Sequence, residues 1–435
     1  MSTAALILIA VQQASSALLG GLPPAVGEAV QVRVAASREE SPTIALRARK
    51  ALTCEYESNR AIDDAVVLIR EGRIVAIGTS DEVEIPEGAI VHDYGDRWLS
   101  PGLIDLHSHV GGSRGDINDM VYQLNSELRV TPAVQPDGSA LQRPLAAGVT
   151  TILFIPGSGT NMGGTGVLMK LGHQGYEEAL VRDPGSLKIA QGDNPKRWGY
   201  GMNRILMNWG LRYRLRRGRA YARAWDAYDS GQGPKPKREL SLDVFRDLYG
   251  GRTQVSTHTQ YYQLVLMTLT MLARDFELPT YIDHGSFDSW KTAPLAEELG
   301  VAAILGPREI NVPRPPRFDT DGRIEGTAWG FQENGNVAIG FNTDAPVVPQ
   351  EELAIQAAMG VRYGLNNDRG QGLRGVTIVP ARVSGLGGRV GSLEVGKDAD
   401  ILVVTGDPID PRTSVDATWI DGELFYDAQD GGRIW

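Results

Sequence analysis

Apolar runs of strand length recur through the middle of the chain, and helix-length segments separate several of them. Eight such runs are GLIDLHSHV (102–110), GVTTILFIPG (148–157), GTGVLMKL (164–171), GSLKIAQG (185–192), TQVSTHT (253–259), PTYIDHG (279–285), GVAAILGP (300–307) and NVAIGFNTD (336–344). Segments such as YQLVLMTLTMLARDFE (262–277) and APLAEEL (293–299) have helical spacing. This alternation predicts an α/β fold, a (β/α)8 TIM barrel with insertions over residues 100–384.

The two flanks of this region have the pattern of short strands instead. Residues 43–99 alternate β-branched and polar positions, with REGR (70–73) at a hairpin turn. Residues 385–430 contain DILVVTGDP and VDATWIDGELFY, which are short apolar runs joined by Gly and Asp turns. We therefore expect one small β-sandwich domain built from both ends of the chain.

An insertion of about residues 194–252 separates the fourth and fifth runs and carries a dense basic cluster. Its arginines recur at helical spacing, as Arg212, Arg216, Arg219 and Arg223 do. One interpretation is a solvated helix face. The other is a lid whose arginines bind a substrate carboxylate, since the guanidinium fork suits that group. For the second interpretation we select Arg204 and Arg212 as substrate-binding residues.

Composition limits the partners and the compartment. The net charge of −10 argues against nucleic acid as a partner, and the single cysteine, Cys54, excludes an internal disulfide framework. Residues 1–30 combine an apolar stretch with small residues, which is typical of a signal peptide or leader, although a positive start is missing. We expect export to the periplasm or medium, with a cytoplasmic location as the alternative. No later apolar run is long enough to predict a membrane-spanning helix.

Polar residues with catalytic potential lie where the apolar runs end. His107 and His109 end the first run, His258 the fifth, His284 the sixth and Asp344 the eighth. Side chains two apart in a strand share a face, so His107 and His109 can bind one metal ion together. Four of the six histidines at strand ends, where barrel enzymes place their chemistry, predict a metal centre.

These same motifs resemble the metal-dependent amidohydrolase superfamily, in its imidazolonepropionase-like and prolidase-like (Xaa-Pro and Xaa-Arg dipeptidase) branch. The resemblance rests on PGLIDLHSHV, THTQ, IDHGS and GFNTDAP, and on VGSLEVGKDADILVVTGDP near the C-terminal end. It covers about residues 43–430. It implies a hydrolase that acts on carbon–nitrogen bonds through a metal-activated hydroxide.

The resemblance also implies roles for single residues. His107, His109 and Asp344 would bind one metal ion, and His258 and His284 a second. Lys188, in the fourth run, would bridge the two as a carbamate; Lys170, or a carboxylate such as Asp193, is the alternative bridge. Asp344 would also be the catalytic proton shuttle.

We therefore expect two Zn²⁺ ions per chain, other divalent metals being alternatives, and a dipeptide-like or small cyclic amide substrate. Two other functions stay open: a mononuclear deaminase or hydrolase of the same superfamily that uses no carbamate, and a non-catalytic scaffold homologue. The second is disfavoured because none of the histidines or the aspartate is missing. We further expect a homo-oligomer.

Overall fold

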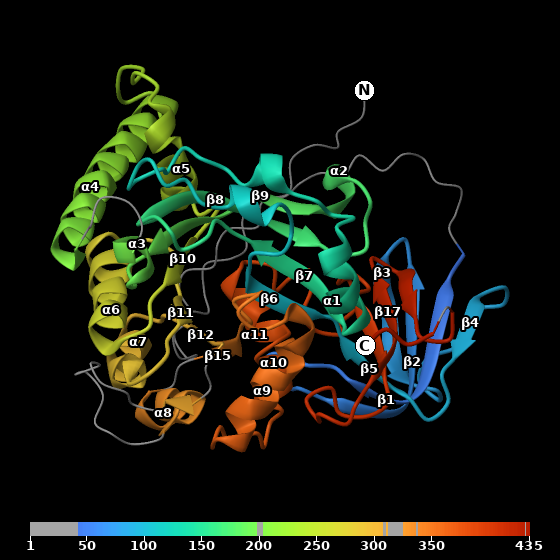
Figure 1. Ribbon diagram of the computed structural model, residues 1–435. Helices are drawn as coiled ribbons and strands as arrows, with labels where there is room; N and C mark the ends of the chain where they lie inside the picture. Colours follow the sequence, from blue (N-terminus) through green and yellow to red (C-terminus); the bar gives the residue numbers. More distant parts are fainter. Residues whose placement is uncertain (1–41, 198–202, 308–309, 312–324, 336–337, 431) are drawn as a thin grey trace, which may run out of the picture.

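The computed structural model describes residues 42–197, 203–307, 310–311, 325–335, 338–430 and 432–435 (Figure 1). The leader expected at residues 1–30 lies outside these ranges. Among the described helices, none combines the length and apolar character needed to cross a membrane.

Both flanks of the chain contribute strands to one eight-stranded sheet, at the right of Figure 1. Its order is β18-β17-β16-β5-β1-β2-β3, and β4 pairs with β1. The strands are β1 (Ile44–Leu52), β2 (Ala61–Arg70), β3 (Arg73–Thr79), β4 (Ile90–Asp93), β5 (Trp98–Pro101), β16 (Ile401–Val404), β17 (Val415–Ile420) and β18 (Glu423–Asp427). The predicted hairpin joins β2 and β3, and Glu71 and Gly72 at its turn both have positive φ. The antiparallel pairing of β16 with β5 joins the two flanks.

Each of the eight apolar runs overlaps a strand, so the predicted α/β pattern is confirmed at this level. One sheet has the order β10-β9-β8-β7-β6 and a second the order β11-β12-β15. The strands are β6 (Leu103–Ser108), β7 (Val149–Phe154), β8 (Met162–Lys170), β9 (Leu180–Ala190), β10 (Val255–His258), β11 (Ile282–His284), β12 (Ala303–Leu305) and β15 (Ile339–Phe341). A two-stranded sheet, β13 (Ile310–Asn311) with β14 (Glu325–Gly326), lies apart from them.

Isolated parallel bridges connect the two sheets at both sides. Thr259 pairs with His284 between β10 and β11, and Ser108 pairs with Ala345 between β6 and the segment after β15. The sheets therefore curl toward one another and bring their strand ends together. Closure of these strands into a complete barrel stays a prediction.

A (β/α)8 barrel would have eight parallel strands, and this part of the prediction is wrong at β8. This strand runs antiparallel to both β7 and β9, whereas β6–β7, β9–β10, β11–β12 and β12–β15 are parallel. The physical reason is the short connection from β7 to β8, since a parallel crossover needs a dozen or more residues.

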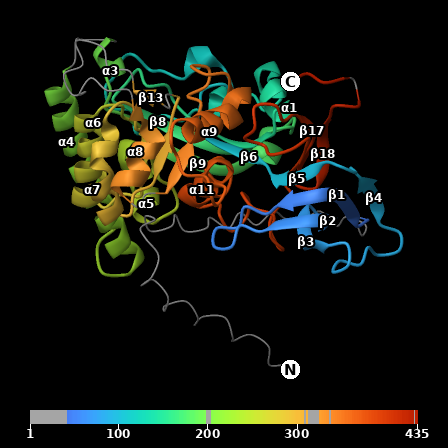
Figure 2. The same ribbon diagram turned by 90° about the horizontal axis from the view of Figure 1, so that it is seen from below.

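Helices cover the strands and fill the insertion. They are α1 (Gln142–Ala146), α2 (Tyr176–Ala179), α3 (Asn194–Arg197), α4 (Arg204–Asp229), α5 (Leu240–Tyr249), α6 (Tyr262–Met267), α7 (Ala293–Glu298), α8 (Thr327–Asn334), α9 (Leu353–Arg362), α10 (Gln371–Arg374) and α11 (Ile378–Val383). The helix predicted over 262–277 is α6 followed by a π-helical turn, Thr268–Asp275. In Figures 1 and 2 the insertion helices α4 and α5 lie at the opposite side of the molecule from the eight-stranded sheet.

Apolar packing fixes β6, the strand of the first two histidines, between the two parts of the fold. Leu103 of β6 and Val149 of β7 share one buried cluster with Leu402 and Val404 of β16. Gly148 allows this contact, because a Cβ there would lie 2.5 Å from a methyl carbon of Leu402. The position of β6 therefore depends on the C-terminal flank of the chain as well as on β7.

Candidate metal centre

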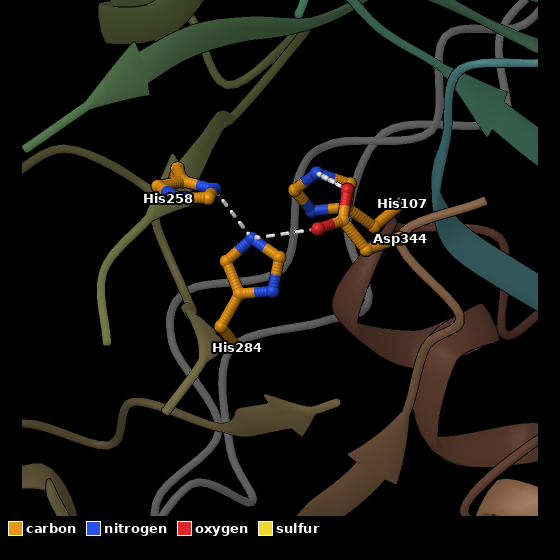
Figure 3. Close-up of side chains that lie close together, drawn as sticks. All are labelled: His107, His258, His284 and Asp344. Atoms are coloured by element: carbon orange, nitrogen blue, oxygen red, sulfur yellow. Dashed lines mark hydrogen bonds and ion pairs between the residues drawn. The ribbon is translucent and has the colours of Figure 1, made fainter. Parts of the chain in front are cut away.

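Four buried side chains from four strand ends converge on one point. His107 lies on β6, His258 and His284 end β10 and β11, and Asp344 follows β15. One ligand atom of each residue lies within 4.8 Å of the others. Figure 3 shows the three imidazoles and the carboxylate pointing toward one another. This arrangement can hold a divalent metal ion.

The two other predicted ligands, His109 and Lys188, adjoin this group. His109 Nε2 lies 3.4 Å from Asp344 Oδ1, the same distance as His107 Nε2. Lys188 Nζ on β9 lies 2.9 Å from His107 Nε2 and is fully buried. All six residues selected from the sequence as metal ligands thus lie in one contiguous cluster.

Hydrogen bonds fix which ring nitrogen faces the centre. His109 Nδ1 donates to the carbonyl oxygen of Ile155 at 2.9 Å, and His284 Nδ1 donates to that of Gly306 at 2.8 Å. A carbonyl only accepts, so Nδ1 carries the proton in both rings and Nε2 keeps its lone pair.

In the imidazole of His258, one ring nitrogen has no hydrogen-bond partner. His284 Nε2 lies 2.7 Å from His258 Nδ1, so His258 donates its Nδ1 proton there. His258 Nε2 is then a buried lone pair with no hydrogen-bond partner in the structure. Unpaired buried polar atoms are rare, and three imidazole lone pairs with a carboxylate form a suitable zinc ligand set.

Electrostatics favours neutral rings and an ionised aspartate. Burial, with the nearby Lys188, lowers the pKa of His107 well below its usual value. Burial also lowers the pKa of His258 in the same way, and that of Lys188 to about 8. Burial alone would raise the pKa of Asp344, but His107 and His284 outweigh it and hold this pKa well below the usual range. Neutral imidazole and ionised carboxylate are the forms that bind metals.

Two cluster residues adopt a backbone conformation that L-residues seldom use. His284 has φ 72° and Asp344 has φ 49°, both in the left-handed region. Such conformations cost free energy and persist where surrounding contacts enforce them, often at functional sites. The strain here aims both side chains at the same point.

Two further carboxylates beside the cluster, those of Asp105 and Asp283, were not selected from the sequence. Asp105 accepts hydrogen bonds from Thr343 Oγ1 at 2.5 Å and from Gln350 Nε2 at 3.2 Å. Asp283 accepts from His107 Nδ1 at 2.8 Å. Burial raises the pKa of each carboxyl to about 7. The sequence did carry a signal for both residues. Each is a charged residue inside an otherwise apolar strand, within two positions of a histidine selected as a ligand.

The alternative bridge, Lys170, lies in a different cluster. Its Nζ contacts Asp398 at 3.0 Å, Asp400 at 2.9 Å and Asp421 at 2.6 Å, all from the segments around β16 and β17. The buried amine therefore joins β8 to the eight-stranded sheet. Among the described contacts of Lys170, none involves a histidine of the metal centre.

Arg204, at the start of α4, lies near the centre through a chain of contacts. The backbone N–H groups of Gln191 and Gly192 both donate to the carbonyl oxygen of His258, at 3.1 Å. The next residue, Asp193, forms an ion pair of 3.1 Å with Arg204 and is not among the metal-site residues. The guanidinium carbon of Arg204 also lies 5.5 Å from the ring centre of Tyr261, three residues after His258.

Arg212, two turns further along α4, has a different setting. Its Nη2 lies 2.9 Å from Asp275 Oδ2, at the end of the π-helical turn. The two arginines selected from the sequence thus have different partners, and Arg204 is the one whose contacts lead through Asp193 to the segment beside His258.

Comparison with known proteins agrees with this geometry. A family model described as "Amidohydrolase family" matches residues 327–425. The chain is 27% identical over 405 residues to Amidohydrolase tasK of Hapsidospora irregularis, a match that covers 83% of this chain and only 40% of that relative. It is 25% identical over 371 residues to the imidazolonepropionase of Sphingopyxis alaskensis, with 80% and 88% covered. The crystal structure of an amidohydrolase from Thermotoga maritima MSB8 superposes with a TM-score of 0.77, at 26% identity over 88% of this chain and 100% of that one.

A mixed α/β fold with histidines and an aspartate gathered at its strand ends defines a class of metal-binding proteins. Within that class, this chain is similar to proteins of the amidohydrolase family, through the model over residues 327–425 and through relatives of 25–27% identity.

Proposed function

We propose that this protein is a metal-dependent hydrolase that cleaves a carbon–nitrogen bond in a dipeptide-like or small cyclic amide. The observation that carries the proposal is the convergence of His107, His258, His284 and Asp344 within 4.8 Å. Relatives named amidohydrolase and imidazolonepropionase support this reaction class. A divalent ion bound there would lower the pKa of water and polarise the substrate carbonyl.

Asp344 is the residue that we expect to move the proton. Its pKa is held well below the usual range, and its carboxylate lies between His107 and His109 on one side and His284 on the other. It would accept a proton from the attacking water and deliver it to the leaving nitrogen. No serine or cysteine nucleophile is needed.

The proposed occupancy is two Zn²⁺ ions. His107, His109 and Asp344 would hold one, and His258 and His284 the other. Lys188 would bridge them after carboxylation, since only a neutral amine adds CO₂ and burial lowers the pKa of this lysine to about 8. The ligands proposed for the first ion lie close to those proposed for the second, and this supports a bridge between the two ions.

A mononuclear deaminase or hydrolase is the second candidate. One observation favours it: His107, His258, His284 and Asp344 already form a set compact enough for one ion. In that case Lys188 stays an unmodified amine.

We also propose that Arg204 binds a carboxylate of the substrate. It is part-exposed and linked through Asp193 and Gly192 to His258. Export and homo-oligomer formation stay predictions.

A panel of dipeptides, N-acyl amino acids, cyclic amides and aminopurines, assayed on metal-replete enzyme, tests the proposal. Hydrolysis of a dipeptide or cyclic amide, lost on chelation and restored by Zn²⁺, is expected. Release of ammonia from an aminopurine alone would favour the mononuclear deaminase, and no turnover of any compound by metal-loaded protein would favour a scaffold.

A further inference from the structure

Asp283 lies directly behind a metal-centre histidine. Its Oδ2 is 2.8 Å from His107 Nδ1, and both side chains are fully buried. On the other side of the ring, His107 Nε2 faces Lys188 Nζ at 2.9 Å and Asp344 Oδ1 at 3.4 Å. The ring thus has a carboxylate on one nitrogen and the centre on the other.

Comparison with the neighbouring imidazole rings shows what the contact with Asp283 does for His107. His109 and His284 are oriented by main-chain carbonyl oxygens, those of Ile155 and Gly306. His107 has a side-chain carboxylate in the corresponding place. Of these three rings, His107 is therefore the one whose tautomer a single substitution behind it can change.

The second oxygen of Asp283 is held by two fixed donors. Asn342 Nδ2 donates to Oδ1 at 3.1 Å, and the backbone N–H of His284 donates to the same atom at 3.1 Å. Asn342 is itself oriented, because it also donates to the carbonyl oxygen of Ile304 at 2.9 Å. Oδ1 therefore always accepts, and Oδ2 is left to accept from His107.

We propose that Asp283 is a positioning residue, which holds the proton of His107 on Nδ1 and so presents the Nε2 lone pair to a metal ion. The proposal rests on the metal centre of the proposed function. Carboxylates that orient a ligating imidazole in this way raise its basicity as well as fix its direction. Asp283 links β11 to β6, so it also sets two ligand strands relative to each other.

Asp283→Asn separates tautomer control from packing. The amide has the shape of the carboxylate, but Asn342 and the N–H of His284 require its oxygen, which turns the NH₂ group toward His107. Nδ1 must then accept, and the ring proton moves to Nε2, where it blocks coordination. The number of hydrogen bonds is unchanged, so a merely structural role for Asp283 predicts little effect on metal binding.

The readout is Zn²⁺ affinity, measured without substrate by competition with a chromophoric chelator on the full chain. We expect Asp283→Asn to bind about 10–100-fold more weakly than wild type. The matched control is Asp183→Asn on β9, a change at a carboxylate that accepts from the hydroxyls of Thr131 and Tyr176 and contacts no histidine ring in the structure. It should keep wild-type affinity.

A second measurement uses the wild-type protein and does not depend on how the variant folds. Long-range ¹H–¹⁵N spectra of ¹⁵N-histidine-labelled metal-free protein, with the His107 signal assigned from His107→Gln, should show its proton on Nδ1. A proton on Nε2, or unchanged affinity in folded Asp283→Asn, would overturn the role of Asp283 and leave the proposed function intact. Wild-type protein that binds no metal would overturn both.

Discussion

Lys188 Nζ and His107 Nε2 lie 2.9 Å apart, and neither side chain is exposed to solvent. The amine thus occupies the side of the imidazole on which a metal ion would bind. Burial lowers the pKa of Lys188 to about 8, so a substantial neutral fraction exists under mildly alkaline conditions. A neutral amine can react with CO₂, and the resulting carbamate would carry the negative charge that a pair of cations needs.

Replacing Lys188 with alanine should abolish hydrolysis and the paired metal ions. The substitution leaves a space between His107 and the other ligands that a small carboxylate can fill. We therefore expect acetate or propionate to restore part of the activity and of the metal content. Steady-state rates and elemental analysis, with and without the added acid, measure both effects.

Lys170→Ala is the comparison for that experiment. Lys170 binds three aspartates around β16 and β17, so its loss should leave the metal content per folded chain unchanged. A fully active Lys188→Ala variant together with a metal-free Lys170→Ala variant would move the bridge to Lys170.

Asp344→Asn should keep the fold and lower turnover. The amide oxygen can still face the ligands, but the amide cannot accept a proton at catalytic pH. Loss of a proton shuttle costs about 10²–10⁴-fold in rate. The measurement is kcat per bound metal ion, and near-native kcat in this variant would remove Asp344 from the shuttle role.

Arg204→Glu should raise KM more than it lowers kcat for substrates that carry a carboxylate. The change places a second acidic side chain beside Asp193, next to the Gln191–Gly192 segment that contacts His258, and the two carboxylates repel an anion. A rise in KM alone indicates lost ground-state binding. Substrates whose carboxylate is converted to an amide should be affected less, and equal KM changes for both forms would contradict the proposed contact.

Arg212→Glu is the matched substitution on the same helix. Arg212 forms its ion pair with Asp275, so we expect a smaller rise in KM than at Arg204. A larger effect at Arg212 would show that substrate approaches from the other side of α4.

Lys170→Met should destabilise the fold, because it leaves buried aspartates without their cation. Removing one partner of a buried ion pair costs about 3–5 kcal/mol. The free energy of unfolding, measured by urea denaturation, gives the loss. Lys50→Met is the control: its partner Asp63 is largely exposed, and ion pairs at the surface contribute about 0–1 kcal/mol.

The same variant should be more unstable at pH 8 than at pH 5. Burial raises the pKa of Asp400 to about 6 even with Lys170 present, and loss of that cation raises it further. A carboxyl whose folded pKa exceeds its unfolded value binds more protons in the folded state, so stability falls as pH rises through that interval. If the difference in the free energy of unfolding between Lys170→Met and wild type did not change with pH, the explanation through the charge of Asp400 would be contradicted.

Sequence periodicity located the strands and the candidate ligands, because His107 and His109 share a face and the other ligands end apolar runs. It did not indicate the direction of β8, since an apolar run such as GTGVLMKL is compatible with either direction. It also missed Asp283, which becomes important only when folding brings its side chain on β11 against His107 on β6. Likewise, the partners of Lys170 are 228 or more positions away in sequence, and only the folded chain brings them together.

The central claim is a metal-dependent centre for carbon–nitrogen hydrolysis, and metal stoichiometry of active protein tests it most directly. Elemental analysis of purified enzyme, paired with the amide-hydrolysis rate during stepwise chelation, is the measurement. The account predicts close to two divalent ions per chain and activity that falls in proportion to metal removed. One ion per active chain would support the mononuclear alternative, and full activity in metal-free protein would contradict the account.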